Sequence, residues 1–217
     1  MFSLESAPST FFVALMALSL VPFFVIMTTA FVKIAVVLLL LRNALGVQGI
    51  PPNMALYGLA TILTVYIMAP VGRDVYEIVN ATGITFENME TILKGFEQIM
   101  EPFQAFLMKH SDDAEKAFFW QTAELLWPAE DFEVIDRNSM LILIPSFAIS
   151  ELSKAFEVGF LLYLPFVVID LIVSNILLAM GMMMVSPTTV SLPFKLLLFV
   201  LVDGWARLIH GLVLTYQ

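Results

Sequence analysis

The sequence predicts an all-α, integral-membrane-type protein of two helical hairpins that flank an acidic helical domain. Hydrophobic residues make up 60% of the 217 residues and charged residues only 13%, whereas soluble domains are about half apolar and a quarter charged. Residues 6–32 and 54–72 carry no charge, and such runs approach the roughly 20 apolar residues that cross a hydrocarbon core. The charge is also uneven, since 16 acidic and 6 basic residues lie between Arg73 and Glu157.

The first hairpin is expected within residues 1–72, with helices over Ser9–Leu41 and Met54–Ala69. Its connector, "RNALGVQGIPPN", contains two glycines and a proline pair, which end helices by freeing φ and by removing N–H donors. Asn53 follows the prolines and is expected to cap the second helix. The amino terminus lacks the basic start of a secretory signal, so we expect the first helix to be retained.

The acidic domain is expected over residues 73–145. Apolar residues recur at helical spacing from Met89 to Phe103, after Thr85 as a possible N-cap. A second helix is expected to start after Ser111, where acidic residues favour a first turn, and to end near Trp127. The stretch "AEDFEVIDRNS" is then expected to form a solvated loop.

The second hairpin is expected within residues 146–217, with helices over Ser146–Met184 and Ser191–Tyr216 and the short turn "VSPTTVSLP" between them. Prolines interrupt the apolar helices or lie at their ends, at Pro22, Pro70, Pro165, Pro187 and Pro193. Charged residues inside apolar runs each cost about 2.5–3.5 kcal/mol in a bilayer and therefore need partners. These helices are expected to be buried against other protein, which indicates an obligate assembly.

Inter-helix or inter-subunit ion pairs are the predicted role of the embedded charges. Asp203 and Arg207 stand at i and i+4, the spacing of an ion pair on a helix. Lys33 is expected to pair with a neighbouring helix, or else to extend to the membrane interface. Lys195 is expected to pair with Glu151, within the hairpin or between adjacent subunits. The alternative is a proton or ion relay through Lys195, Asp170 and Glu151.

Enzymatic and nucleic-acid functions find no support in the sequence. The chain has no cysteine, and its only histidines are His110 and His210. No HExxH motif or nucleophile elbow is present. We therefore expect no catalytic residues, no metal site and no cofactor. The net charge of −9 argues against nucleic acid as a partner, because a phosphate binder needs a basic face.

Four methionines lie within five positions in "LLAMGMMMVSPTTVSLPFK", at Met180, Met182, Met183 and Met184. Methionine is flexible and specifies packing poorly. The run is interpreted either as core filler between irregular helices or as a compliant apolar ring that lines an opening.

Two long blocks, "FVKIAVVLLLLRNALGVQGIPPNMALYGLA" and "YLPFVVIDLIVSNILLAMGMMMVSPTTVSLPFKLLLFVLVDGW", closely resemble the signature blocks of the FliP/SctR family. This family belongs to the type III protein export apparatus of flagella and virulence injectisomes, and the resemblance covers nearly the whole chain. The lack of an amino-terminal signal and the "LLWPAEDFE" region favour the injectisome branch.

The resemblance implies a protein-conducting export gate subunit without enzymatic activity. Five copies are expected to assemble with FliQ/SctS-type and FliR/SctT-type subunits into a cone whose helices are lifted largely out of the bilayer. Met182, Met183 and Met184 map onto the family's pore gasket, with Gly181 and Pro187 at its turn. Secreted unfolded polypeptides and membrane lipid are the other expected partners.

The expected location is the bacterial inner membrane, with the acidic domain on the periplasmic side. Arg42 and Lys195 flank the two short connectors, and basic residues near short loops favour the cytoplasmic face. The alternative function is an ion or small-molecule transporter that uses the intramembrane charges as a relay.

Overall fold

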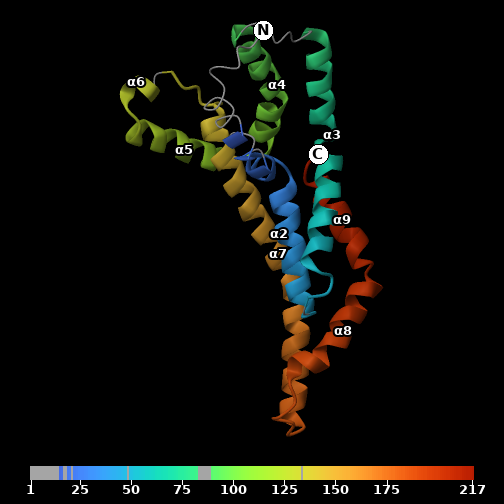
Figure 1. Cartoon of the computed structure of the whole chain (residues 1–217). Coiled ribbons are helices and arrows are strands. Elements are labelled where there is room, and N and C mark those ends of the chain that lie inside the picture. Colours follow the sequence, from blue (N-terminus) through green and yellow to red (C-terminus); the bar gives the residue numbers. More distant parts are fainter. Residues whose placement is uncertain (1–14, 17–18, 21, 48, 83–88, 133) are drawn as a thin grey trace.

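The computed structural model describes residues 15, 16, 19, 20, 22–47, 49–82, 89–132 and 134–217, and helices are the only regular secondary structure in this part of the chain. The molecule is an elongated rod of helices with a wider head (Figure 1). The long helix α7 (Met140–Ala179) runs along the rod, and α4 (Met89–His110) and α5 (Asp113–Leu126) form the head. The predicted all-α class is confirmed.

The first predicted helix is divided in two. Residues 22–27 are helical, residues 28–30 form a break, and α2 then runs over Phe31–Leu45. The hydroxyl groups of Thr28 and Thr29 donate to the carbonyls of Phe24 and Val25, both at 2.7 Å, and such bonds to the preceding turn bend helices. The prediction of one helix over Ser9–Leu41 is therefore wrong at Thr28–Ala30, and its first residues lie outside the described part.

Helix α3 (Asn53–Thr82) is longer than expected, because it continues through Pro70. The expected division at residue 72 therefore falls inside a continuous helix. Asn53 begins this helix, but its side chain accepts a hydrogen bond from the Arg42 guanidinium. The Arg42 guanidinium also donates to the Pro51 carbonyl at 3.3 Å, so it holds the connector closed.

The head follows the predicted pattern closely. Helix α5 begins after Asp112, whose side chain accepts from the Ala114 backbone N–H at 2.9 Å, and it ends before Trp127, as predicted. The four-residue helix α6 (Ala129–Phe132) interrupts the stretch expected to be a loop. The proposed N-cap Thr85 lies outside the described residues.

The carboxyl-terminal half forms a hairpin with a bent return arm. Helix α7 begins six residues earlier than expected and ends at Ala179 rather than Met184. The return arm consists of α8 (Pro187–Leu201) and α9 (Gly204–Leu214), which meet at an angle of 61°. Pro165, Pro193 and Pro70 all lie inside helices that continue past them, so the predicted interruptions at these prolines are wrong.

Asp203 and Gly204 make the elbow between α8 and α9. Asp203 has φ 51°, a left-handed conformation that short polar side chains tolerate. A Cβ on Gly204 would lie 2.2 Å from the Phe199 ring, so only glycine lets the helices bend this closely. The expected single helix over Ser191–Tyr216 is therefore wrong at Val202 and Asp203, which lie between α8 and α9.

Helix α2 lies at the centre of the hydrophobic core. Its residues Ile34, Val37, Leu38 and Leu41 are fully buried, and they pack against α3, α7, α8 and α9. Most of the circumference of α2 is apolar, which suits a helix enclosed by other helices. Gly159 allows α7 to approach α2 closely, since a Cβ there would lie 2.2 Å from a methyl group of Leu40 and 3.2 Å from its Cβ.

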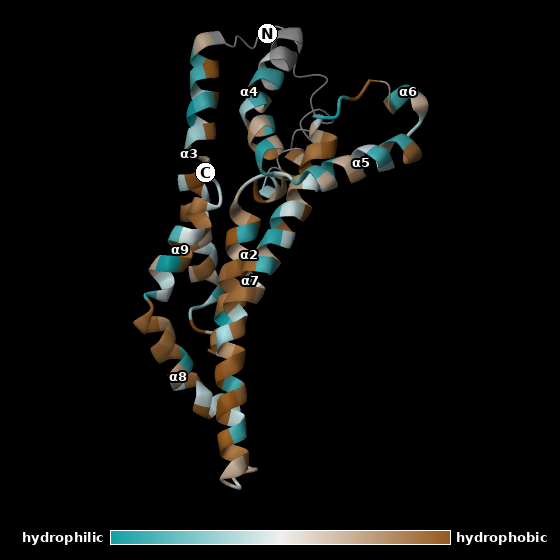
Figure 2. Cartoon of the chain, turned by 180° about the vertical axis from the view of Figure 1, so that it is seen from behind, coloured by the Kyte–Doolittle hydropathy of each residue, from teal (hydrophilic) through white to brown (hydrophobic). Residues whose placement is uncertain are grey.

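The chain is a membrane protein that exposes much more surface than a compact monomer. Helices α3 and α7 are long and apolar enough to cross a membrane, and α8 with α9 would be a third span if counted together. The accessible surface is 14871 Å², whereas a compact monomer of 24.2 kDa exposes about 10,000 Å². Large apolar side chains are exposed along the rod, and much of the ribbon of α7 and α8 has the brown colour of hydrophobic residues (Figure 2).

We predict that Gly159→Ala destabilises the fold by about 1–3 kcal/mol, because the added methyl group overpacks the contact with Leu40. Urea unfolding of the detergent-purified protein would measure this change. Gly58→Ala is the matched control, since a Cβ at this helical position meets nothing within 4 Å. Equal unfolding midpoints for the two variants would show that the α2–α7 contact is not tight.

Candidate functional site

The turn between α7 and α8 places the methionine run at one end of the rod (Figure 1). Gly181, at φ 73°, ends α7 because this left-handed conformation costs glycine little. The Gly181 N–H donates to the Leu178 carbonyl at 3.0 Å, and the Met182 N–H donates to the Leu177 carbonyl at 2.9 Å. These two bonds form a Schellman motif, which fixes the direction in which the chain leaves the helix.

The methionine side chains of this turn point into solvent. Met183 is 82% exposed and Met184 is fully exposed, while Met180 and Met182 are also exposed. Pro187 then occupies the first turn of α8, where its missing N–H costs nothing. The side chains do not fill the core of this chain, so the core-filler interpretation is wrong within a single copy.

A buried carboxylate, Glu151 of α7, joins three parts of the chain. Its oxygens lie 3.2 and 3.3 Å from Lys33 Nζ of α2, and both side chains are at most 2% exposed. The Tyr216 hydroxyl group also donates to Glu151, and Lys33 Nζ lies 3.6 Å from the centre of the Tyr216 ring. The expected pairing of Lys33 with a neighbouring helix is therefore confirmed.

Aromatic contacts extend this polar cluster into the head. The Tyr216 ring lies 5.1 Å from the His110 ring and stacks on Phe106 at 6.1 Å between ring centres. Lys154, 3.8 Å from Glu151, donates to the His110 carbonyl at 2.7 Å. Burial and the nearby lysine charges lower the pKa of His110 to about 4. The imidazole is thus neutral at neutral pH and packs as an aromatic side chain.

A second ion pair joins α8 to α7 and α2. Lys195 Nζ lies 2.7 Å from Asp170 Oδ2 and donates to the Ala44 carbonyl at 3.1 Å. Ala44 is in the last turn of α2, where a positive charge is favourable. Ser191 donates to the other Asp170 oxygen at 2.6 Å. Each oxygen of this carboxylate therefore has a donor.

These contacts correct the within-chain form of the predicted Lys195–Glu151 pair. Lys195 pairs with Asp170, and Glu151 pairs with Lys33, because the length of α7 separates the two sites along the rod. A Lys195–Glu151 pair between adjacent subunits stays a prediction. The three proposed relay residues do not form one connected network among the described residues.

The predicted ion pair between Asp203 and Arg207 is also wrong. Asp203 precedes α9 in the left-handed conformation, so the two residues do not share a helix face. Their link is a backbone bond from the Arg207 N–H to the Asp203 carbonyl at 3.1 Å. No salt bridge joins their side chains in the described part of the chain.

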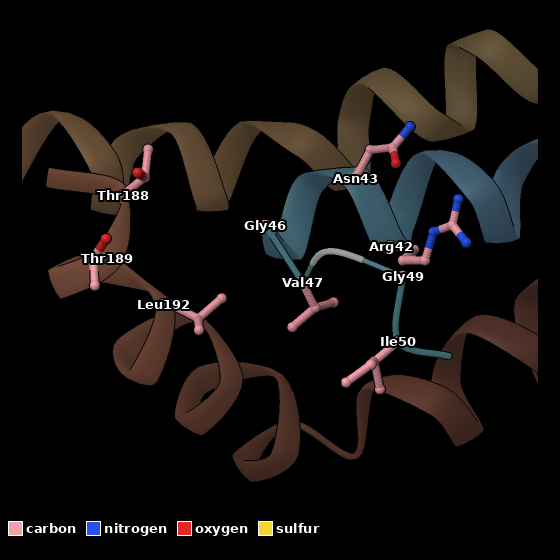
Figure 3. Close-up of a pocket in the computed structure, with 9 residues that line it drawn as sticks. All are labelled: Arg42, Asn43, Gly46, Val47, Gly49, Ile50, Thr188, Thr189 and Leu192. Atoms are coloured by element: carbon pink, nitrogen blue, oxygen red, sulfur yellow. The ribbon is translucent and has the colours of Figure 1, made fainter. Parts of the chain in front are cut away.

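Two of the cavities that border the return arm are also lined by residues of α2. One, of about 670 Å³, lies between the connector after α2 and the start of α8, with Arg42, Ile50, Thr188 and Leu192 at its wall (Figure 3). The other, of about 600 Å³, lies inside the elbow and is lined almost entirely by apolar side chains of α2, α7, α8 and α9. Among the described residues, no group of three or more His, Cys, Asp or Glu residues could hold a metal ion.

Sequence reasoning missed the functional contacts of Tyr216, Lys154 and Ser191. Tyr216 appears in the sequence analysis only as the end of a predicted helix. A buried tyrosine, however, usually needs a partner for its hydroxyl group. Lys154 stands three residues after Glu151, a spacing at which helical side chains meet. Ser191 carried no such signal, because its contact with Asp170 depends on how α8 folds back.

Comparison with known proteins gives a consistent result. The FliP family matches residues 14–212. The chain is 55% identical to "Yop proteins translocation protein R" of Yersinia pestis over 204 residues, 94% of each chain. It is 47% identical to "Hypersensitivity response secretion protein HrcR" of Ralstonia nicotianae over 205 residues, 93% of this chain and 94% of the relative. It is 45% identical to "Virulence protein YscR" of Salmonella typhimurium over 218 residues, 99% of this chain and 100% of the relative.

We predict that Lys33→Met destabilises the protein by about 3–5 kcal/mol, because it leaves the buried Glu151 carboxylate without its main counter-charge. Urea unfolding in detergent measures the loss. The double variant Lys33→Met/Glu151→Gln removes both charges and should lose less than the single variant. Lys116→Met is the control, since Lys116 pairs with an exposed Asp113 and such pairs contribute at most about 1 kcal/mol. A loss at Lys33 as small as that at Lys116 would contradict the prediction.

Proposed function

The chain belongs to the FliP family, and from this premise we propose that it is a core subunit of a type III secretion export gate, through which unfolded proteins cross the inner membrane. The observation that carries the proposal is the family match over residues 14–212. The names of the relatives, which refer to translocation, secretion and virulence, favour the injectisome branch. The chain is accordingly a component of a secretion apparatus.

The surface of the chain supports a role within an assembly. Apolar side chains cover much of the rod, and the exposed area is about half as large again as a compact monomer of this mass would have. We infer that neighbouring subunits cover this surface. The proposed neighbours are further copies of this chain, five in total, together with FliQ/SctS-type and FliR/SctT-type subunits.

The arrangement of the rod supports a proposed orientation. The head, α4 to α6, and the methionine turn lie at opposite ends (Figure 1). Helix α7 has 40 residues and is therefore about 60 Å long at 1.5 Å per residue, twice the thickness of a hydrocarbon core. We place the head on the periplasmic side, and part of α7 would then lie outside the bilayer.

The methionine turn is proposed as the gasket of the closed pore. Its thioether side chains are exposed in the single chain, and they are flexible enough to seal against one another and to yield to a passing polypeptide. Gly181 and Pro187 fix the turn that presents them. An assembly of five copies would bring fifteen such side chains together from Met182, Met183 and Met184.

Neither catalysis nor ion transport is favoured by the geometry. The charges proposed for a relay are used in separate structural contacts, Lys195 with Asp170 and Glu151 with Lys33. We therefore propose that the protein is not an enzyme and that its embedded charges hold helices together. A transporter remains the alternative function.

Purification from the native membrane tests the proposed function. An export gate subunit should be recovered in a large complex with two other membrane proteins, and deletion of its gene should abolish secretion until the gene is restored. A homodimer that transports ions when reconstituted alone would support the transporter instead.

We predict that replacing Met182, Met183 and Met184 together with Ala leaves assembly near normal but raises ion leakage. Truncating solvent-facing side chains leaves no buried cavity in the subunit. The closed pore, however, loses the apolar side chains that would seal it. Ion conductance of membranes that contain the complex is the measurement. Met54→Ala, an exposed methionine of α3, is the control and should not change it. Loss of assembly in the triple variant would favour a packing role, and unchanged conductance would exclude the gasket.

A further inference from the structure

Helix α5 stands apart from the rod, and one of its faces is exposed in the part of the chain that the structure describes. It projects sideways from the head in both views (Figures 1 and 2). Its attachment to α7 includes the bond from the Asp112 N–H to the Ser150 hydroxyl oxygen at 2.8 Å. Ala123, on the inner side of α5, is buried, and Trp120 packs against Phe132 of α6.

The opposite face of α5 is apolar and exposed. At 100° per residue, Ala114, Phe118, Gln121 and Leu125 fall within a sector of about 60°, directly opposite Ala123. All four are exposed, with Phe118 at 57% and Leu125 at 84%. We call these four residues the outer stripe of α5. A helix that carries large apolar groups on the face turned away from its own core indicates an interaction surface.

The surroundings of the outer stripe are strongly acidic. The arm from Asp112 to Arg137 contains eight acidic residues and two basic ones. Both basic side chains are already engaged, Lys116 with Asp113 at 2.7 Å and Arg137 over the Trp120 ring at 5.3 Å. Glu115 and Glu124 flank the stripe on its two sides. A partner that covers this surface must therefore supply positive charge.

Charge argues against two of the possible occupants. Helices that lie on membranes carry Lys and Arg on their polar face, and anionic lipid would repel an arm of this charge. A second copy of the chain is also disfavoured, because its net charge is −9 and the charge outside residues 73–157 is only +1. We propose that the outer stripe of α5 binds a different protein, through an apolar ridge flanked by Lys or Arg residues.

The inference goes beyond the proposed function, which requires only that the chain enters a multi-protein complex. To test it, a photoreactive amino acid is placed at Leu125 in the full chain, produced in the native bacterium, and the intact membrane complex is irradiated. The expected product is an adduct with one other protein, in which the cross-linked peptide, identified by mass spectrometry, carries Lys or Arg. The same amino acid at Val134, exposed on the arm outside the stripe, should give at most a fifth of that adduct.

Charge variants decide whether the contact has the proposed chemistry. Glu115→Lys with Glu124→Lys should lower the adduct at Leu125 at least fivefold, and the matched Glu115→Gln with Glu124→Gln should lower it less. Phe118→Glu should lower the adduct formed from Leu125 as strongly as the charge reversal. Because Phe118 and Glu124 are exposed and Glu115 is only half-buried, the amount of assembled gate complex should stay unchanged.

Four results would overturn the inference: an adduct with a second copy, an adduct with lipid, no adduct, or an adduct that the charge reversal leaves intact. None of these results bears on whether the chain is an export gate subunit, which gene deletion and complementation test separately. Failure of the inference and failure of the proposed function are therefore distinguishable.

Discussion

The burial of one carboxylate, Glu151, is the constraint on which the half of the structure nearest the head depends. A buried charge is stable only if it is paired and hydrogen-bonded, and Glu151 receives Lys33 from α2, Tyr216 from the carboxyl terminus and, at 3.8 Å, Lys154 from its own helix. Each of these groups has to be in place at once. The carboxyl terminus is therefore held against α2, and the return arm is fixed at both of its ends.

A second constraint is the small residue at the α2–α7 contact. Gly159 lets α2 approach α7 until the Leu40 side chain occupies the space of a missing Cβ, and Ala155, one turn earlier, is fully buried beside it. Small residues have this role between helices in membrane proteins, where dispersion contacts replace the hydrophobic effect. Nearer the methionine turn, the pair of Lys195 and Asp170 ties α8 to the same two helices.

The remaining surface includes two kinds of exposed apolar area that are suited to contacts with other molecules. Along the rod the surface consists mainly of exposed apolar side chains, as expected where lipid or other subunits of the gate cover the helices. On α5 an apolar stripe is bordered by acidic groups instead, which selects for a basic protein surface. The methionine turn belongs to neither kind, because flexible thioethers on a rigid Schellman turn suit a surface that changes shape.

Local sequence alone was enough to predict the helical class, the apolar character of the chain and the head helices α4 and α5, whereas it extended α7 past Gly181 to Met184. The features predicted correctly follow from local composition and N-cap chemistry, which neighbouring residues supply. The partners of the buried charges were decided only by the tertiary structure. The predicted pair of Lys195 and Glu151 rests on their place in one hairpin, but α7 is long enough to hold two separate sites, and Asp170 is the carboxylate that pairs with Lys195 of α8. The elbow at Asp203 and the continuous helices through Pro70 and Pro165 were likewise decided by packing, because contacts with other helices can offset the cost of a left-handed residue or of a missing N–H donor.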